Sequence, residues 1–235
     1  MQYLSTKAII LQKIPFKDFK YIIKLYSEKY GLISADIELR YYVQPAHIQV
    51  PNICDLQILQ NKYKKNTVKE IKPVYIYKNI LTNYQKNIIA QFIAEVLLKT
   101  IKEEEHTDPK IFQYAHDILI QLDQSEQKTD DIFHLNFLKK YIELSGHAPL
   151  NNYSSAYPYF DLMEGRFVGT LNQHTLSKED SKHLYCFLFD NISPSANLPV
   201  LNITHHLIKY MQYHQGLTEL HTLTFLKESL LEYKI

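Results

Sequence analysis

The lysines of the first 80 residues are the side chains of this sequence best suited to bind a ligand. Residues 1–80 hold 13 Lys and Arg against 6 Asp and Glu, a net charge of +7, whereas residues 81–235 hold 13 against 19, a net charge of −6. Clustered cations attract a phosphate chain whatever its sequence. The first 80 residues therefore favour a polyanion as ligand.

Aromatic residues alternate with these cations. Single-stranded nucleic acid suits such a surface, because each base can stack on a ring and each phosphate can contact a cation. The alternative is an ordinary lysine-rich solvated surface in a chain with 24 Lys and only 2 Arg. Tyr26, Phe16 and Phe19 lie among the cations, and Lys20, Lys24, Lys62, Lys64 and Lys65 are expected to contact phosphates. The full set of candidate DNA-binding residues is Lys7, Lys13, Lys17, Lys20, Lys24, Arg40, Lys62, Lys64, Lys65, Lys69, Tyr21 and Tyr63.

Other chemistry has little support in the sequence. The chain contains no HExxH, GxGxxG, GxxxxGK[ST] or GxSxG motif, so we predict no catalytic residue, metal ion or cofactor. Ten of the eleven histidines follow residue 80, which leaves a histidine-metal hydrolase as a distant alternative. Cys54 and Cys186 have no CxxC partner, and we see neither a signal peptide nor an apolar run of membrane-spanning length. We therefore expect a cytoplasmic protein without disulfides.

The hydrophobic rhythm changes near residue 80. Five short strands are expected over residues 6–13, 19–27 and 32–37 and around 54–58 and 68–77, with a turn at residues 15–18. From residue 82 the apolar residues recur at helical spacing in six segments, and residues 150–175 are irregular. The predicted fold class is α+β. Residues 1–80 form an N-terminal five-stranded OB-fold β-barrel, and residues 81–235 form an all-α helical domain.

Four segments, in order along nearly the whole chain, resemble the RecO family of bacterial DNA-repair recombination mediators. Residues 7–11 (KAIIL) and 22–34 (IIKLYSEKYGLIS) resemble the start of that family, and residues 92–104 (FIAEVLLKTIKEE) look like the first helix of its helical domain. Residues 159–167 (YFDLMEGRF) are similar to its central FDL-x-EG segment, best matched in Bacteroidetes-type members. The resemblance implies a non-enzymatic protein, associated with the nucleoid, that anneals DNA strands and helps load RecA. The implied partners are single-stranded DNA, RecR and the single-stranded-DNA-binding protein.

The sequence departs from the family pattern at two places. Many RecO proteins carry a four-cysteine zinc ribbon where residues 150–175 lie, but this stretch has no cysteine and only His147 and His174 flank it, so we predict that it folds without zinc. The basic loop that follows the third strand in the family is reduced here to a single cation, Arg40. This second departure leaves open an alternative function, a protein-interaction adaptor whose barrel no longer binds nucleic acid.

The acidic helical domain is expected to bind proteins rather than DNA. In the family, the single-stranded-DNA-binding protein presents an acidic tail that ends in a hydrophobic residue, and such a tail needs an apolar groove with a cation at its rim. The candidate residues are Phe137, Lys139, Lys140 and Tyr141. The alternative is that the two aromatic residues belong to the core and the two lysines are solvated.

Overall fold

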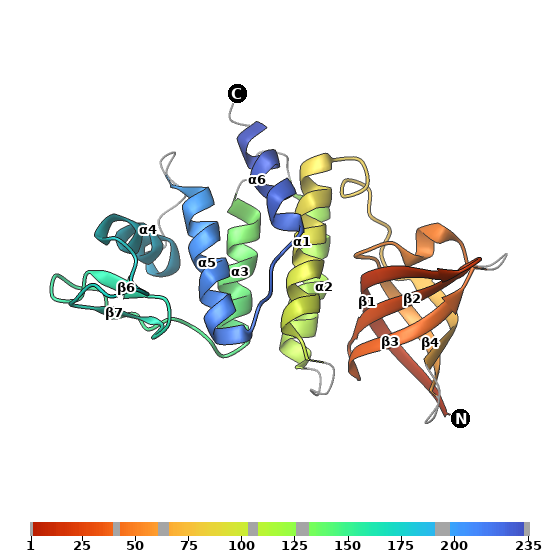
Figure 1. The fold of residues 1–235 in the computed structure, drawn as a ribbon. Coiled ribbons are helices and arrows are strands. Elements are labelled where there is room, and N and C mark those ends of the chain that lie inside the picture. The colour runs from red at the N-terminus through yellow and green to blue at the C-terminus, as the bar shows by residue number, and fades with distance from the viewer. Residues whose placement is uncertain are drawn as a thin grey trace. The chain divides into compact units, whose positions relative to one another are not determined.

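The computed structural model describes residues 2–39, 43–60, 66–102, 108–125, 132–190 and 198–232 (Figure 1). Its contacts divide the chain into two compact units, residues 1–130 with 220–235 and residues 131–219. Within the described ranges, none of the helices is long and apolar enough to cross a membrane.

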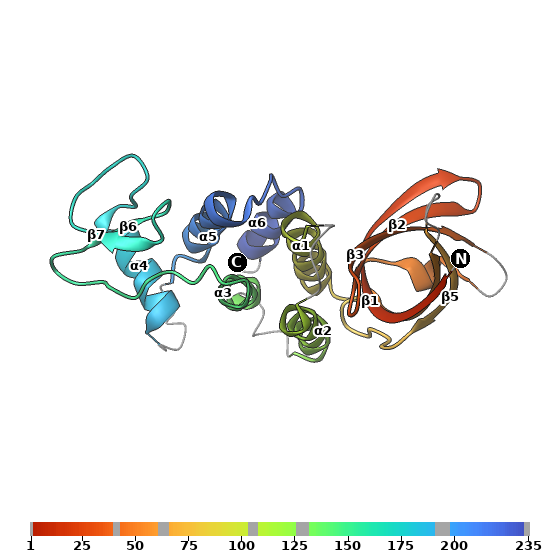
Figure 2. The ribbon, with the colours of Figure 1, turned by 90° about the horizontal axis from the view of Figure 1, so that it is seen from below.

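The first unit contains a closed barrel of five strands. These are β1 (Gln2–Lys17), β2 (Lys20–Ser27), β3 (Gly31–Glu38), β4 (Ile53–Gln60) and β5 (Asn66–Pro73), with the 3-10 helix η1 (Pro45–Ile48) between β3 and β4. The strands close into a barrel (Figure 2) in the order β1-β2-β3-β5-β4, and the β3–β5 pair is parallel whereas the other pairs are antiparallel. This is the Greek-key barrel of the OB fold, so the predicted fold class is confirmed.

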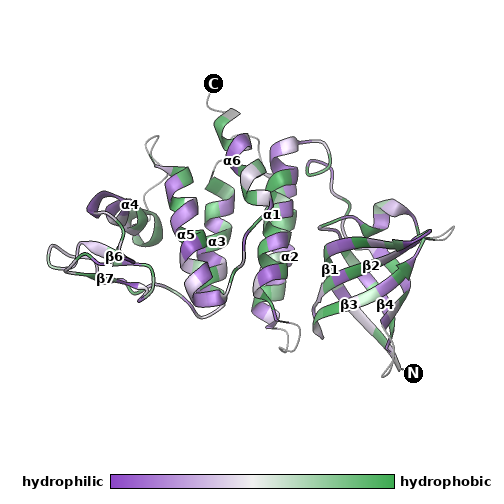
Figure 3. Ribbon diagram, viewed as in Figure 1, coloured by the Kyte–Doolittle hydropathy of each residue, from purple (hydrophilic) through white to green (hydrophobic). Residues whose placement is uncertain are grey.

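Alternation along the strands builds the barrel core. In β2, Ile23 and Leu25 are fully buried, while Lys20 is exposed and Lys24 is half-buried. Figure 3 shows hydrophobic and hydrophilic residues mixed along the strands and helices, as expected for elements with one face turned to a core. The barrel core also includes Leu4, Ala8, Ile10, Ile33, Ala35, Ile37, Val43, Ile48, Cys54, Leu56, Ile58, Val68 and Ile71.

Three helices complete the first unit: α1 (Tyr84–Thr100), α2 (Pro109–Gln124) and α6 (Thr222–Glu232). Helix α1 contacts β1, α2 and α6, and it therefore buries apolar residues on most of its circumference. Glu95 of α1 accepts hydrogen bonds from the backbone N–H of His221 (2.9 Å) and Thr222 (2.8 Å) at the start of α6. Burial would raise the pKa of Glu95, but these hydrogen bonds and that from Lys99 lower it to about 2.

One aspartate fixes the connection between the barrel and the helices. Asp123, near the end of α2, is buried and accepts hydrogen bonds from the backbone N–H groups of Lys78 (3.1 Å), Asn79 (2.8 Å) and Ile80 (2.8 Å). Burial would raise its pKa, but these bonds outweigh that effect and lower it. The expected boundary at residues 80 and 81 lies between the end of β5 at Pro73 and the start of α1 at Tyr84, whereas the compact units have other bounds. It stays a prediction that residues 1–80 bind nucleic acid and that residues 81–235 bind proteins.

The second unit contains α3 (Phe133–Leu144), β6 (Tyr159–Asp161), β7 (Arg166–Val168), α4 (Lys178–Phe189) and α5 (Val200–Gln215). Helix α4 begins where the sequence indicates, because the Ser177 side chain accepts a hydrogen bond from the Asp180 N–H at 3.0 Å. The stretch that we expected to be irregular contains the antiparallel β6–β7 hairpin.

Candidate nucleic-acid interface

The paired ends of β1 and β2 form an exposed arm on the barrel (Figure 2). Pairing continues from Gln12 opposite Lys24 to Lys17 opposite Lys20. Every residue from 13 to 20 is exposed, whereas Leu11 and Ile23, at the base, are buried. We call residues 12–22 the hairpin arm.

The turn of this arm differs from the sequence prediction. We expected a turn over residues 15–18, but β1 continues through Pro15, and Asp18 and Phe19 alone connect the strands. A proline is tolerated in a strand at an irregularity, and the β1–β2 register shifts between Pro15 and Lys17. The correction moves Phe16 from the expected turn into the strand and leaves Phe19 at the tip.

The arm gathers four of the predicted DNA-binding residues. Lys17 lies opposite Lys20 across the strand pair, and the Lys13 Nζ lies 5.5 Å from the centre of the Tyr21 ring. Two like charges placed opposite one another destabilise a strand pair, so this arrangement favours an anion nearby. The Lys20 Nζ lies 3.9 Å from a carboxylate oxygen of Glu38, an exposed pair of little net strength.

The other described cations lie apart from this group. Lys24 is half-buried opposite Gln12 and Ser34, and Lys69 is exposed on β5. Lys7 lies opposite Asp55 of β4, and both line a polar pocket with Glu70. Because the Asp55 and Glu70 carboxylates share this pocket with Lys7, they would repel a phosphate there. Outside the described residues lie Arg40, Lys62, Tyr63, Lys64 and Lys65.

The structure corrects the expectation that Tyr26 belongs to an aromatic surface beside the cations. Its side chain points away from the barrel core, but it is buried, and its ring centre lies 5.5 Å from that of Phe112 on α2. It therefore contributes to the packing of the barrel against α2 and is not available to stack on a base. Phe16 and Phe19, which we expected only to accompany the cations, are both well exposed. The apolar composition of residues 14–19 was the sequence signal for them.

The four residues proposed to bind a protein tail do not form an open groove. Phe137 and Tyr141 are 0% and 2% exposed, and their stacked rings lie 5.7 Å apart in the core of the second unit. The expectation that they line a groove is wrong, because packing covers both. The Lys139 Nζ donates a hydrogen bond to the Phe187 carbonyl oxygen at 3.1 Å, and burial lowers the pKa of Lys139 despite the nearby Glu143. Lys140 forms an exposed ion pair with Glu143 at 2.9 Å.

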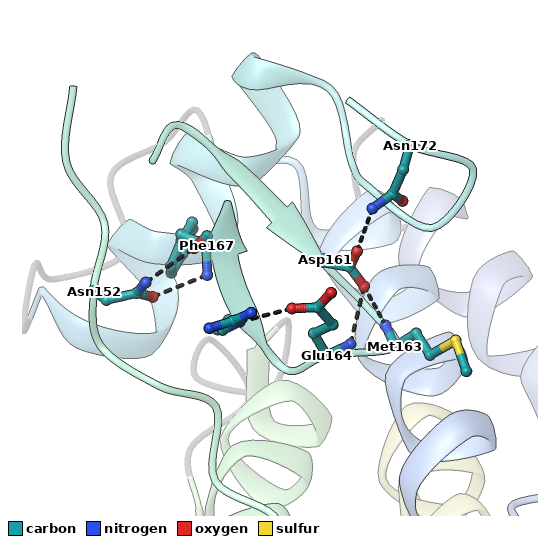
Figure 4. A network of polar contacts seen from close by, with 7 residues as sticks. Asn152, Asp161, Met163, Glu164, Phe167 and Asn172 are labelled. Carbon is teal, nitrogen blue, oxygen red and sulfur yellow. Dashed lines mark hydrogen bonds and ion pairs between the residues drawn. The ribbon is translucent and has the colours of Figure 1, made fainter. Parts of the chain in front are cut away.

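The FDL-x-EG segment forms the centre of a polar network around the β6–β7 hairpin (Figure 4). Asp161 is 1% exposed, and its Oδ1 accepts hydrogen bonds from the backbone N–H of Met163 (2.8 Å) and Glu164 (2.9 Å). The Asn172 side chain donates to Oδ2 at 2.6 Å. Burial would raise the pKa of Asp161, but these hydrogen bonds lower it. Asp161 thus acts as an acceptor that fixes three separate groups.

Glycine and asparagine complete this network. Gly165 has φ +69°, and a Cβ there would lie 3.0 Å from the Tyr210 hydroxyl oxygen, so a side chain would be strained and crowded. Asn152 pairs with the backbone of Phe167: its Nδ2 donates to the carbonyl oxygen and its Oδ1 accepts from the N–H, both at 2.9 Å. Asp161 and Gly165, which lie in the segment that resembles the family motif, therefore help to fold this hairpin together with Asn152 and Asn172 from outside it.

The two histidines that flank this stretch lie beside other ring side chains. The ring of His147 lies 6.5 Å from that of His214, and the His174 Nδ1 lies 3.3 Å from the Tyr213 hydroxyl. Across the described part of the chain, no three His, Cys, Asp or Glu side chains are grouped so that they could hold one metal ion. Folding without zinc stays a prediction for solution measurement.

Comparison with known proteins identifies chains that are similar to this one. No family model matches the chain. DNA repair protein RecO of Flavobacterium johnsoniae is 28% identical over 197 residues, which cover 80% of this chain and 81% of that protein. DNA repair protein RecO of Flavobacterium psychrophilum is 27% identical over 244 residues, 96% and 98% of the two chains. Eight curated proteins match, and all carry this name. Over most of its length the chain is therefore similar to proteins of the RecO family.

This similarity agrees with the fold described above. The match to the Flavobacterium psychrophilum protein extends over nearly the full length of both chains, so it includes the barrel, the helices and the β6–β7 hairpin. DNA repair protein RecO of Enterococcus faecalis is similar over a shorter stretch: it is 27% identical over 157 residues, which cover 62% of this chain and 55% of that protein. All of these similar proteins are named as DNA repair proteins.

Proposed function

We propose that this RecO-family protein is a recombination mediator that binds single-stranded DNA on its barrel. In this proposal it anneals complementary strands and, together with RecR, helps load RecA. No bond is made or broken, so the protein is not an enzyme. The observation that supports this best is the hairpin arm, which combines Lys13, Lys17 and Lys20 with exposed aromatic rings.

The position of the arm in the fold favours DNA. In OB folds, the loop between the first two strands and the loop between the last two border the oligonucleotide-binding face. The arm is the first of these loops, and Lys62, Lys64 and Lys65 belong by sequence to the second. Cations on both loops would neutralise phosphates on one strand and so reduce its repulsion of a complementary strand.

We propose that residues 81–235 bind protein partners. Their net charge of −6 opposes contact with DNA. RecR and the acidic tail of the single-stranded-DNA-binding protein are the proposed partners, in the cytoplasm near the nucleoid. Since Phe137 and Tyr141 are buried, the tail would need another apolar surface. Binding of a labelled tail peptide by the full chain, compared with a peptide lacking its last residue, tests this part.

A salt titration of single-stranded DNA binding tests the central proposal. If about four phosphates are neutralised, log K should fall with log salt at a slope of about −3. Replacing Lys17 and Lys20 with Ala should make the slope shallower by about 1.4, since each lost phosphate contact contributes about 0.7. The matched control replaces Lys178 and Lys182, which are exposed on α4, and should leave the slope unchanged.

The adaptor function is the second candidate, and the Glu38 carboxylate beside Lys20 favours it, because this acidic group competes with a phosphate. A flat salt response, or no binding at all, would support the adaptor and reject the DNA site. If the salt slope became equally shallow in the Lys17 and Lys20 variant and in the Lys178 and Lys182 variant, DNA would bind by nonspecific charge attraction rather than at a site on the arm.

A further inference from the structure

We propose that the tip of the hairpin arm is an aromatic wedge, in which Phe16 and Phe19 stack on unpaired nucleobases. This inference rests on the proposed function and deepens it by naming the residues that would contact the bases. The lysines of the arm would contact phosphates, and the two phenylalanines would contact base faces.

Exposure is the first observation behind the wedge. Phe19 is 71% exposed, Phe16 is 53% exposed, and Ile14 beside them is also exposed. Soluble proteins expose single apolar residues commonly, but apolar groups gathered at one projecting tip mark a binding surface. Neither phenylalanine belongs to the barrel core.

Backbone conformation is the second observation. Phe19 has φ +59°, the left-handed region that glycine and asparagine occupy readily and bulky residues rarely do. The Leu39 N–H donates a hydrogen bond to the Phe19 carbonyl oxygen at 2.6 Å, which fixes this conformation at the end of β3. A large side chain in a disfavoured conformation, without core contacts, is typical of a residue retained for function.

The charges around the tip select a nucleic-acid ligand over an apolar protein surface. Lys13, Lys17 and Lys20 lie on the same arm as the two rings, and Asp18 is the one acidic residue between positions 12 and 22. The Lys17 Nζ lies 5.6 Å from the centre of the Phe16 ring, so a cation and a ring are available within the reach of one nucleotide. An apolar protein partner would have to desolvate these ammonium groups without neutralising them.

Stacking of this kind also fits strand annealing. A base stacked on a phenyl ring contacts it through its face, and its Watson–Crick edge remains available to a complementary strand. A wedge that separates neighbouring bases would therefore present them for pairing while the lysines reduce the repulsion between the two backbones.

The absence of tryptophan from the sequence gives a clean test. Phe19→Trp places a single indole at the tip, and its fluorescence should be strongly quenched when oligo(dT) saturates the protein, because the base stacks on it. The matched control is Phe225→Trp on α6, since Phe225 is 54% exposed, and its fluorescence should not change. Binding is followed in parallel by the anisotropy of a labelled oligo(dT).

A second variant separates stacking from charge. Phe19→Gly suits the positive φ, so the protein should fold at least as well as the wild type, yet its affinity for oligo(dT) should fall about fivefold or more. The salt slope should stay unchanged, because a lost stack releases no counterion.

The outcomes distinguish the wedge from the function on which it rests. An anisotropy rise without tryptophan quenching, or with wild-type affinity in Phe19→Gly, would overturn the wedge and leave DNA binding intact. No anisotropy rise with any variant or with the wild type would reject DNA binding itself, and the wedge with it. Quenching in both tryptophan variants would also overturn the wedge, because contact would not be confined to the tip.

Discussion

The β1–β2 hairpin and the β6–β7 hairpin use the same antiparallel pairing for opposite purposes. Residues 13–20 of the first are all exposed, and the charged and aromatic side chains at its tip face solvent. In the second, Phe160, Asp161 and Phe167 are buried, and polar side chains fix the turn from inside. The first hairpin presents groups to a ligand, and the second is part of the architecture.

The difference follows from strand length and support. β1 and β2 are paired over many residues and belong to a closed barrel, and β2 stays paired with β3 up to Lys20 opposite Glu38, so backbone pairing alone supports the exposed side chains at their ends. β6 and β7 have three residues each, and an isolated two-stranded hairpin is marginal in water. The second hairpin therefore depends on Asp161 and Asn152, whereas the first can carry a strained residue such as Phe19.

The largest expected effect of a substitution is on the β6–β7 hairpin. Asp161→Ala removes an acceptor that binds two backbone N–H groups and the Asn172 side chain. Leaving these groups without a partner should lower the free energy of unfolding by about 3 kcal/mol. Urea denaturation followed by circular dichroism measures the change.

Glu164→Gln is the matched control for this experiment. Glu164 lies three residues away and forms an exposed ion pair with Arg166 at 2.7 Å, so its replacement should change stability by about 0.5 kcal/mol or less. Equal effects of the two substitutions would show that the Asp161 network does not hold the hairpin.

A pH titration should separate the two units that carry these hairpins. Burial lowers the pKa of His134 in α3 from 6.5 to about 3, and its Nε2 lies 2.8 Å from the Thr204 hydroxyl. The folded state keeps this imidazole neutral while the unfolded state takes up a proton below pH 6.5. Stability should therefore fall by about 1.4 kcal/mol per pH unit as the pH drops below 6.5 towards 3.

Glu95 of the first unit should act in a lower pH range. Its pKa falls from 4.5 to about 2 on folding, so its contribution to stability is present above pH 4.5 and is lost as the pH falls below that value.

The His134 prediction is measured above the range in which Glu95 acts. Urea denaturation at pH 6.5 and pH 5 should show that the free energy of unfolding of the wild type falls by about 2 kcal/mol. His134→Gln should lack this loss, and an unchanged pH dependence in that variant would exclude His134 as its source.

Local sequence patterns predicted the helices and strands of this chain well. They could not predict burial that depends on contacts between residues far apart in the sequence. Alternation in β2 gave the inward positions of Ile23 and Leu25, and Ser177 marked the start of α4. The outer face of β2 could not be read in the same way, because Tyr26 is covered by Phe112 from a helix more than 80 residues later. The two residues at the tip of the arm were visible as apolar side chains, but their conformation depends on pairing that continues through Pro15.

The β6–β7 hairpin was harder to predict for a physical reason. Asp161 and Asn152 act on backbone N–H and carbonyl groups, which every residue carries, so no residue pairing in the sequence reveals them. The sequence does show that cysteines are missing from residues 150–175. What holds that stretch in their place became visible only in the structure.

A moderate effect is expected at Asn152, which fixes the opposite side of the same hairpin. Asn152→Ala removes both hydrogen bonds to the backbone of Phe167. The loss should be about 1–2 kcal/mol, smaller than at Asp161 because Asn152 is neutral and only half-buried. The double variant with Asp161→Ala tests whether the two sides form one network: a combined loss smaller than the sum of the single losses indicates coupling, and strict additivity contradicts it.

The smallest effect on stability is expected at the tip of the β1–β2 arm. Lys17 and Lys20 lie opposite one another and exposed, so replacing both with Ala removes a repulsion and few packing contacts. The free energy of unfolding should stay within about 0.5 kcal/mol of the wild type, or rise slightly, most clearly at low salt, where repulsion is least screened. Urea denaturation at two salt concentrations measures this. A loss of 2 kcal/mol or more would mean that the arm is structural, as the β6–β7 hairpin is, and the contrast between the two hairpins would fail. Retained stability together with a shallower salt dependence of DNA binding would instead establish the arm as a surface kept for its ligand.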